Sequence, residues 1–372
     1  MRRQDPLILG AGPAGCAVAI ALAHGGARPM LLDHAETVGD PLCGGFLSWR
    51  TLQQLQALGV DPFQLGGHRI THLRLFSAGR TATTSLPQVA CGLSRHALDS
   101  ALRAAALDAG AQMAFDHITA VEQGVARGKK HDWRSETLFL ASGKHDLRGA
   151  ARPRRTADPA LGLRLRLAPT RQRAEMLGDH IELHLFAGGY VGMVLQEDGT
   201  ANLCLALRKS ALTRAGGSPH NLLAELAARD PAMAARLGDD WAQARIETIG
   251  AVPYGWIAEE TADGLYRIGD QAAVIPSLAG EGIGIALASG QQAASYWLEL
   301  GPAGAARFQR AFAQKARRPV QVARVARGLA ESPLGGLLAI FATERIPATI
   351  HALARMSRIE TAPTAIPATN SH

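Results

Sequence analysis

The chain carries at residues 10–15 the sequence Gly10-Ala11-Gly12-Pro13-Ala14-Gly15, between the apolar run Leu7-Ile8-Leu9 and a small-residue helix that we expect to end near His24. A strand, a glycine turn and a helix in this order are typical of a dinucleotide site. The glycines let the backbone approach a pyrophosphate, and the helix N-terminus offers N–H groups to the anion. A second apolar strand ends at Asp33, eighteen residues after Gly15, where a carboxylate can accept hydrogen bonds from the adenosine ribose. The sequence therefore predicts a dinucleotide-binding domain.

The composition is that of a globular protein with more than one folding unit. Of 372 residues, 47% are hydrophobic and 19% are charged, and this length predicts two closely joined domains. The formal net charge is +7, but basic residues are scattered from Arg2 to Arg358 and aromatic residues make up only 5%. A nucleic-acid surface needs a basic stripe with stacking rings, so no nucleic-acid partner is expected. The charge indicates a basic surface or attraction of anionic cofactors and substrates.

The sequence predicts a cytoplasmic protein with reduced cysteines. Its four cysteines, Cys16, Cys43, Cys91 and Cys204, are far apart and predict neither a disulfide framework nor a structural zinc site. The N-terminus reaches Asp5 and Pro6 at once, unlike a signal peptide. No apolar run approaches the roughly twenty residues that a membrane span requires, so no integral membrane segment is expected.

The periodicity predicts an α/β fold in which an antiparallel sheet domain interrupts a nucleotide-binding domain. Residues 1–70, 91–150 and 248–300 show strand and helix patterns, with Ser48 and Ser94 as helix N-caps. Residues 71–90 and 151–247 alternate with a period of two and contain glycine turns, which is typical of an antiparallel sheet that holds a substrate. Residues 301–360 are expected to be helical, and residues 361–372 are expected to be a disordered tail.

Three further segments and one arginine form a recognisable set with the first glycine cluster. They are the loop Cys43-Gly44-Gly45-Phe46-Leu47-Ser48, Arg95 at the start of its helix, the strand end Tyr266-Arg267-Ile268-Gly269-Asp270, and Pro276 followed by Gly280-Glu281-Gly282-Ile283. This set resembles the flavoprotein monooxygenase and geranylgeranyl reductase-like superfamily over roughly residues 1–300. The resemblance implies a Rossmann-like FAD-binding domain, with NAD(P)H as the electron donor.

The resemblance also implies a role for each segment. The first glycine cluster and Asp33 would hold the adenosine end of FAD, and Arg95 would lie over the phosphates and the ribityl chain. Cys43, Gly44 and Gly45 would border the flavin. Asp270, after Gly269, would bind a ribityl hydroxyl as a charge-assisted acceptor. Gly280, Gly282 and Ile283 would lie beside the flavin ring, where the positive end of the helix dipole stabilises negative charge on the reduced ring.

Two features depart from members of this superfamily that act on aromatic compounds. Aromatic hydroxylases usually carry Asp-Gly, linked to FAD and NAD(P)H, where this chain has Ser142-Gly143. The chain also lacks the Trp-x-Trp-x-Ile-Pro motif of flavin halogenases. The first departure and the Cys-Gly-Gly loop favour hydride transfer, whereas the apolar face of the predicted sheet could supply the dry pocket that hydroxylation requires.

His180, Glu182 and His184 would share one face of a strand, because alternate side chains of a strand point the same way. Two imidazoles and a carboxylate at this spacing could bind a metal. The same trio could instead form the polar face of a half-buried sheet, with Ile181, Leu183 and Leu185 turned to the core, or line the substrate cavity. The sequence analysis assigns no metal site.

Other side chains are candidates for the pocket. Tyr190, Tyr254 and Trp256 could form an aromatic pocket over the flavin or belong to the core of the sheet domain. Cys43 is expected to face the flavin without a catalytic duty. The basic stretch Lys315–Arg327 and the apolar stretch Leu334–Phe341 could rest on a membrane surface or admit a lipid-like substrate, or could belong to helices that close the fold.

The first functional hypothesis is an NAD(P)H-dependent flavin monooxygenase of secondary metabolite biosynthesis that hydroxylates a small aromatic, polyketide-like or lipid-like compound. The alternative is a flavin-dependent reductase or dehydrogenase of a carbon–carbon double bond. A third possibility, a non-catalytic flavin-binding electron-transfer protein, is disfavoured because a carrier needs no roofed cavity. The residue pattern identifies no catalytic acid or base.

Overall fold

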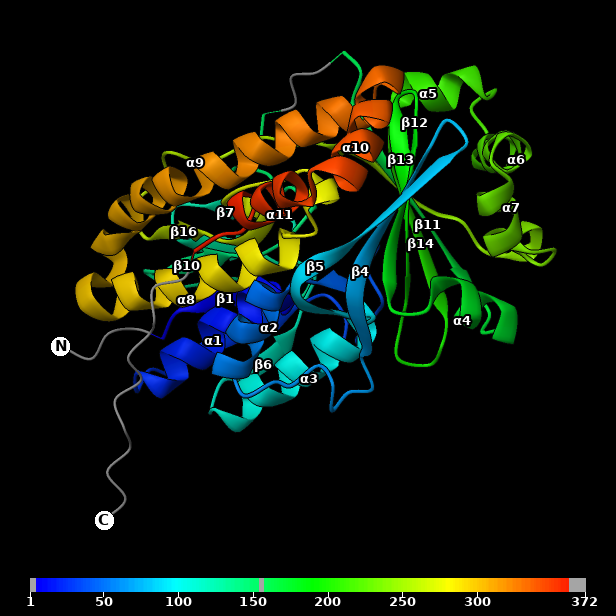
Figure 1. The fold of residues 1–372 in the computed structure, drawn as a ribbon. Helices are drawn as coiled ribbons and strands as arrows, with labels where there is room; N and C mark the ends of the chain where they lie inside the picture. Colours follow the sequence, from blue (N-terminus) through cyan, green and yellow to red (C-terminus); the bar gives the residue numbers. More distant parts are fainter. Residues whose placement is uncertain (1–4, 154–156, 361–372) are drawn as a thin grey trace.

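A five-stranded parallel sheet forms the centre of the nucleotide-binding part of the computed structural model, which describes residues 5–153 and 157–360 (Figure 1). Its strand order is β16-β10-β1-β2-β6, and each neighbouring pair is parallel. The strands are β1 (Leu7–Leu9), β2 (Met30–Asp33), β6 (Gln112–Phe115), β10 (Leu138–Leu140) and β16 (Leu265–Arg267). These short strands are largely apolar because helices or a smaller sheet cover both faces.

Helices α1 (Pro13–His24), α3 (Arg95–Asp108) and α8 (Gly282–Leu300) pack together on this sheet, and Figure 1 shows α1 beside α8. Helix α1 is buried along most of its length, which explains its small side chains. Ser48 Oγ caps α2 (Trp49–Ala57) by accepting from Thr51 N–H, and Ser94 Oγ caps α3 in the same way. Both predicted N-caps are confirmed.

A second sheet of eight strands carries the other half of the molecule, in the order β15-β11-β14-β13-β12-β4-β5-β3. Its strands are β3 (Phe46–Leu47), β4 (His68–Ser77), β5 (Arg80–Gly92), β11 (Ala160–Leu167), β12 (His180–Phe186), β13 (Gly189–Leu195), β14 (Ala201–Arg208) and β15 (Glu247–Val252). The sheet is mostly antiparallel as predicted, but β12 and β4 pair in parallel. Strand β15 pairs with β11, so its residues belong with this sheet and the boundary predicted at residue 248 is wrong.

Helices cover the side of this sheet that faces away from the nucleotide-binding part. They are α4 (Arg171–Leu177), α5 (Lys209–Arg214), α6 (Pro219–Arg229) and α7 (Pro231–Leu237). Short 3₁₀ turns connect other elements: η1 (Trp241–Gln243), η2 (Gly269–Gln271), η3 (Ser277–Ala279) and η4 (Gly301–Gly304). A small outer sheet holds β7 (Ala120–Glu122), β8 (Val125–Arg127) and β9 (Asp132–Arg134).

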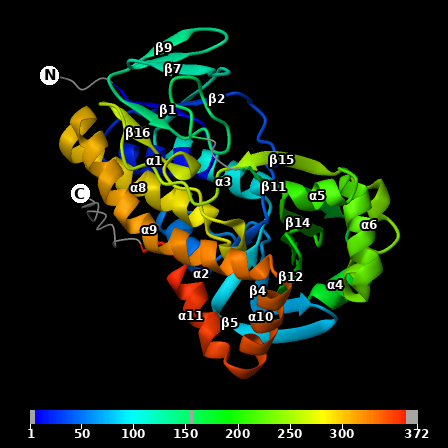
Figure 2. The same ribbon diagram turned by 90° about the horizontal axis from the view of Figure 1, so that it is seen from above.

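Three helices complete the fold as expected for residues 301–360: α9 (Ala305–Ala330), α10 (Pro333–Arg345) and α11 (Pro347–Met356). Figure 2 shows α10 and α11 at an outer edge, beside β5. Within the described ranges, no single helix is long and apolar enough to cross a membrane. The stretch Gly282–Ala330 and α10, which are bent by 109° relative to each other, have the length and composition for a span only when taken together. The predicted tail at 361–372 lies outside the described residues.

We predict that Gly290→Ala destabilises the fold, whereas Gly328→Ala does not. A Cβ on Gly290 would lie 2.6 Å from Ala14 O and 3.0 Å from Val18 N, both backbone atoms of α1. Forcing α1 and α8 apart should lower the free energy of unfolding by ~1–3 kcal/mol. A Cβ on Gly328 in α9 would meet no atom within 4 Å, so alanine at this position should raise the free energy of unfolding by ~0.5–1 kcal/mol. Urea unfolding of both variants checks this, and equal stabilities would contradict it.

Candidate active site

A cavity of about 560 Å³ lies between the two large sheets and extends to α9, α10 and α11. Each of the segments singled out in the sequence contributes to its lining: residues 12–14, 42–46, 269–270 and 279–283, together with Arg95. The middle and far parts of the lining come from β4, β12, β13, β14 and the C-terminal helices. The fold therefore brings the two ends of the predicted cofactor site to one place and joins them to an apolar chamber.

The glycines of the first loop have different roles. A Cβ on Gly10 would lie 2.5 Å from Ala141 O, and the φ of Gly10 is +118°. A Cβ on Gly15 would lie 1.8 Å from Gly10 O. These two positions thus need glycine for packing within the fold. Gly12 has φ −85° and its missing Cβ points to the cavity, where the closest atom is Arg95 Nη2 at 3.5 Å. Gly12 therefore keeps space open at the N-terminus of α1.

Asp33 holds the same loop from behind. Its Oδ2 accepts a 2.8 Å hydrogen bond from Ala11 N–H, and its Oδ1 accepts one from Ala35 N–H at 3.1 Å. Arg103 Nη2 lies 3.1 Å from Asp33 Oδ2, and the carboxylate is buried outside the cavity lining. Asp33 thus fixes the loop through backbone contacts, and its bond to the ribose stays a prediction.

Arg95 places a fixed positive charge beside Gly12. Asp99 accepts hydrogen bonds from Arg95 Nε at 2.8 Å and Nη2 at 2.6 Å, one turn further along α3. Burial opposes the charged form, but Asp99 more than offsets this and raises the pKa of Arg95 above its usual value. A guanidinium held in this way is suited to the phosphates of a dinucleotide.

Residues 269–283 form the opposite wall of the cofactor end. Gly269 has φ +60°, its N–H donates to Ser289 Oγ at 2.7 Å, and the following Asp270 lines the cavity. A Cβ on Gly282, the first residue of α8, would meet no atom within 4 Å. The positive end of the α8 dipole therefore borders open space, as the resemblance implies for the edge of a flavin ring.

Glu281 anchors this wall to the segment that follows α11. Its Oε2 accepts hydrogen bonds from Ser48 Oγ and Arg358 Nη1, both at 3.0 Å, and its Oε1 accepts one from Ile359 N–H at 3.2 Å. Burial raises the pKa of Glu281, although Arg358 opposes this shift. The sequence analysis missed Arg358, because a single arginine after a helix gives no local signal of this contact.

The Cys43 loop closes the cavity on the side of the second sheet. Cys43 O accepts hydrogen bonds from Asn202 Nδ2 and from Cys204 Sγ, both at 3.0 Å. A Cβ on Gly44 would meet no atom within 4 Å, and Gly45 has φ +70°. Burial raises the pKa of Cys204 to about 12, so this side chain is a neutral thiol.

Two tyrosines bring polar atoms into the apolar part of the cavity. Tyr190 Oη and Ser277 Oγ are 2.5 Å apart, and Tyr254 Oη donates to the same Ser277 Oγ at 2.9 Å. Burial raises the pKa of both phenols, most strongly that of Tyr190. The two tyrosines were expected from the sequence, whereas Ser277 has no sequence signal that marks it. Trp256 lies outside the cavity lining, beneath the guanidinium of Arg152, so its assignment to the pocket is wrong.

His184 also lies outside the cavity, because the polar trio of β12 points to the other face of the sheet. The cavity side of β12 consists of Ile181, Leu183 and Leu185. Glu182 accepts hydrogen bonds from Arg74 and Arg236 at 2.5–2.8 Å, and His184 Nδ1 lies 2.6 Å from Asp230 Oδ2. Burial alone would raise the pKa of Glu182, but the nearby His184 and the hydrogen bonds from Arg236 lower it to about 2. The expectation that His184 belongs to the pocket is therefore corrected.

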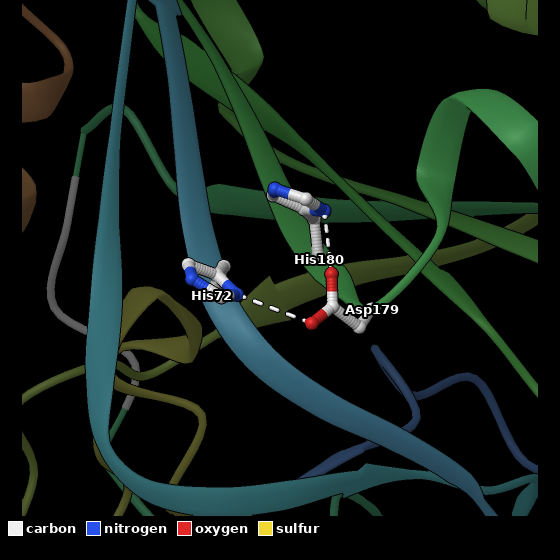
Figure 3. Close-up of side chains that lie close together, drawn as sticks. All are labelled: His72, Asp179 and His180. Carbon is white, nitrogen blue, oxygen red and sulfur yellow. Dashed lines mark hydrogen bonds and ion pairs between the residues drawn. The ribbon is translucent and has the colours of Figure 1, made fainter.

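A second polar group lies on the same face, where Asp179 stands between His72 and His180 (Figure 3). His72 Nδ1 and His180 Nδ1 each lie 3.1 Å from an Asp179 oxygen. Arg74 Nη2 donates to His180 Nε2 at 2.9 Å, so in the neutral ring the proton is on Nδ1. That nitrogen has no lone pair for a metal while the Arg74 bond is present. The contacts of this group are those of a hydrogen-bonded network.

Comparisons with known proteins agree with this geometry. A family model described as "FAD binding domain" matches residues 3–131. The menaquinone reductase of Mycolicibacterium smegmatis is 27% identical over 78% of this chain and 76% of that protein. The digeranylgeranylglycerophospholipid reductase 2 of Methanosphaera stadtmanae is 26% identical over the same shares of the two chains.

Solved structures share the fold at low sequence identity. The flavin-dependent brominase Bmp2 has a TM-score of 0.74 at 16% identity, over 96% of this chain and 94% of that chain. A variant of the halogenase PltM in complex with FAD has a TM-score of 0.69 at 12% identity, over 88% and 77%. The predicted fold class is confirmed: a Rossmann-like FAD-binding domain, a mostly antiparallel inserted sheet and a C-terminal helical segment.

The residues at the cofactor end fit FAD. A Cβ on Gly44 or Gly282 would meet no atom within 4 Å, and a Cβ on Gly12 would reach only Arg95 Nη2 at 3.5 Å. These three positions therefore leave room for a large planar and charged cofactor. Arg95 would hold the pyrophosphate and Asp270 a ribityl hydroxyl, while the N-termini of α1 and α8 would face the phosphates and the ring.

We predict that Gly12→Ala weakens FAD binding without unfolding the chain. Alanine tolerates φ −85° at this N-cap position, but its methyl group would occupy the space beside Arg95. The dissociation constant of FAD should rise at least about tenfold. Titration of the apoprotein, followed by flavin fluorescence, measures the change. Gly39→Ala is the control, because Gly39 lies outside the lining and a Cβ there meets no atom within 4 Å. Equal FAD affinities in both variants would contradict this assignment.

Proposed function

The chain belongs to the superfamily of FAD-dependent oxidoreductases, and within it we propose that the protein reduces a carbon–carbon double bond in a long apolar substrate such as an isoprenoid lipid. The observation that carries this proposal is the apolar lining of the cavity. Its apolar part runs from the predicted flavin position past Leu73, Leu75 and Leu183 to Ala326 on α9 and Leu338 on α10. A chamber with this apolar lining suits a hydrocarbon chain.

Two of the relatives that cover most of the chain support the same substrate class. They are named as reductases of menaquinone and of a digeranylgeranyl phospholipid, whereas the brominase and halogenase structures, at 12–16% identity, support the fold alone. From the sequence alone, hydroxylation was the first hypothesis and reduction of a double bond the alternative. We now propose reduction first and keep hydroxylation as the second candidate. NAD(P)H is proposed as the electron donor on the superfamily resemblance. A pure electron carrier would have no use for the apolar chamber.

The bound cofactor would supply a hydride, and the protein's residues would position the substrate and provide the proton that the second carbon needs. The apolar side chains of β4 and β12 exclude water and orient the double bond against the sheet wall. The N-terminus of α8 and Arg95 place positive charge at the cofactor end, which favours the more negative reduced state.

Tyr190 is the group best placed to deliver the proton. Either hydroxyl can be the donor between Tyr190 Oη and Ser277 Oγ, and Tyr254 O–H donates to the same Ser277 Oγ. In the proposed arrangement Ser277 donates to Tyr190 Oη, so that the Tyr190 proton is free for the substrate. The raised pKa keeps Tyr190 protonated throughout the neutral range. Arg327 lies over the ring of Tyr254 at 4.7 Å and would stabilise negative charge as protons move along the chain.

The reaction class can be tested with the FAD-loaded protein reduced by dithionite without oxygen. Addition of menaquinone or geranylgeraniol should reoxidise the flavin, and mass spectrometry should find a product with two additional hydrogen atoms. Reoxidation only after air is admitted, with a product that has gained an oxygen atom, would establish hydroxylation and overturn the proposal. Reoxidation in air with both compounds unchanged would count against both reactions on these lipids.

We predict that Tyr190→Phe slows reduction by ~10²–10⁴-fold, the range for loss of a general acid, with FAD affinity unchanged. The rate-limiting proton transfer should increase the solvent deuterium isotope effect on flavin reoxidation, which a purely structural role would not do. Tyr296→Phe on α8 is the matched control, because Tyr296 lies outside the cavity lining and should leave both quantities unchanged. A wild-type rate and isotope effect in Tyr190→Phe would remove Tyr190 from the proton path.

A further inference from the structure

Large apolar side chains are exposed on one part of the surface. Within the described residues, eight of the nine exposed large hydrophobic side chains lie between positions 325 and 356, and the ninth is Leu107 on α3. We call these eight residues the α10 face: Val325, Leu329, Leu334, Leu337, Leu338, Phe341, Ile346 and Met356. Figure 2 shows α10 and α11, which carry most of them, at the outer edge of the molecule. Exposed large apolar side chains gathered on neighbouring helices mark a contact site for a membrane, another protein or an apolar ligand.

The cavity reaches the surface within the α10 face. Leu329 and Leu338 line the cavity and are also 47% and 62% exposed to solvent. Ile350 and Leu353 of α11 continue the same lining. An apolar molecule that enters at this point meets hydrocarbon side chains from the surface to the chamber.

Basic residues are spread along the chain, but the net positive charge comes from the same helices. Residues 305–360 contain ten arginine and lysine residues and three glutamates, and this excess equals the +7 of the whole chain. Arg324, Arg345 and Arg355 are exposed there. Glu331 is buried and paired with Arg208 and Arg327, which leaves Glu344 and Glu360 as the exposed acidic groups. An apolar face with this charge complements a bilayer with anionic headgroups.

We propose that the α10 face docks on an anionic lipid bilayer and that apolar substrates pass from the bilayer directly into the cavity. A second copy of the chain is a poorer occupant, because a symmetric contact would place the same basic helices against each other. The docking step does not depend on the reaction, whereas the delivery step rests on the proposed function. The two can therefore fail separately.

Flotation of the FAD-loaded protein with lipid vesicles tests the docking. The protein should bind phosphatidylcholine vesicles that contain phosphatidylglycerol, and Leu334→Asp/Phe341→Asp should weaken this binding at least about tenfold. Leu334 and Phe341 are 76% and 56% exposed and lie outside the cavity lining, so FAD content and thermal unfolding should stay unchanged. Leu107→Asp, at a side chain 47% exposed on α3, is the matched control and should bind as the wild type does.

A second pair of variants tests the role of charge. Arg345→Gln/Arg355→Gln should weaken binding to phosphatidylglycerol vesicles and reduce its dependence on salt. Arg171→Gln/Arg229→Gln removes the same charge from exposed positions on α4 and α6 and should have little effect. The proposal is overturned if Leu334→Asp/Phe341→Asp still binds vesicles as the wild type does. It is also overturned if Leu107→Asp loses vesicle binding to the same extent as Leu334→Asp/Phe341→Asp.

Two further measurements separate the remaining outcomes. The first is sedimentation of the wild type and of Leu334→Asp/Phe341→Asp. If the wild type is a dimer that does not bind vesicles, and the variant is a monomer, the α10 face belongs to a contact with a second copy and the membrane proposal is overturned. Activity of the same variant on geranylgeraniol in detergent micelles reports on the reaction alone. If this variant keeps its activity in micelles but loses its activity on geranylgeraniol embedded in vesicles, delivery from the bilayer is supported. Equal activity of the variant on both forms of the substrate overturns delivery.

Discussion

The close contact between α1 and α8 is the constraint on which the cofactor end of the cavity depends. Gly290 lets the backbone of α8 lie against Ala14 and Val18 of α1, and Ser289 on the same turn accepts from Gly269 N–H. This contact sets both helix N-termini and the strand end at Asp270 around one space. Two positive helix ends then face the same cavity, a costly arrangement unless an anionic group lies between them. The packing and the electrostatics of the site thus lead to the same requirement.

The sequence was sufficient where the physics is local. The loop at 10–15, the caps Ser48 and Ser94, and the strand that leads to Asp270 are each defined by neighbouring residues, and the structure has the expected elements at each position. The resemblance to a superfamily then linked segments that local patterns cannot connect. FAD as the cofactor followed from that link, since a glycine loop by itself is compatible with several dinucleotides.

The sequence was insufficient where the answer depends on residues that are distant along the chain. Alternation along β12 shows that Glu182 and Leu183 point to opposite faces, but it does not tell which face borders the cavity. Arg74 and Arg236, which come from β4 and α7, decide this by pairing with Glu182 on the far side. The boundary at residue 248 failed for a similar reason, since the partner of β15 is β11.

The distribution of polar groups along the cavity relates the proposed chemistry to the proposed docking. Fixed positive charge lies at the cofactor end, a hydroxyl chain of Tyr190, Ser277 and Tyr254 lies in the middle, and leucines lie at the opening. Insertion of oxygen into a substrate needs no proton delivered to a substrate carbon, whereas saturation of a double bond does. A hydroxyl chain that lines an apolar chamber, with Tyr190 itself buried, is therefore more useful to a reductase. The same apolar chamber needs an apolar phase at its opening, because a hydrocarbon substrate would otherwise have to enter through water.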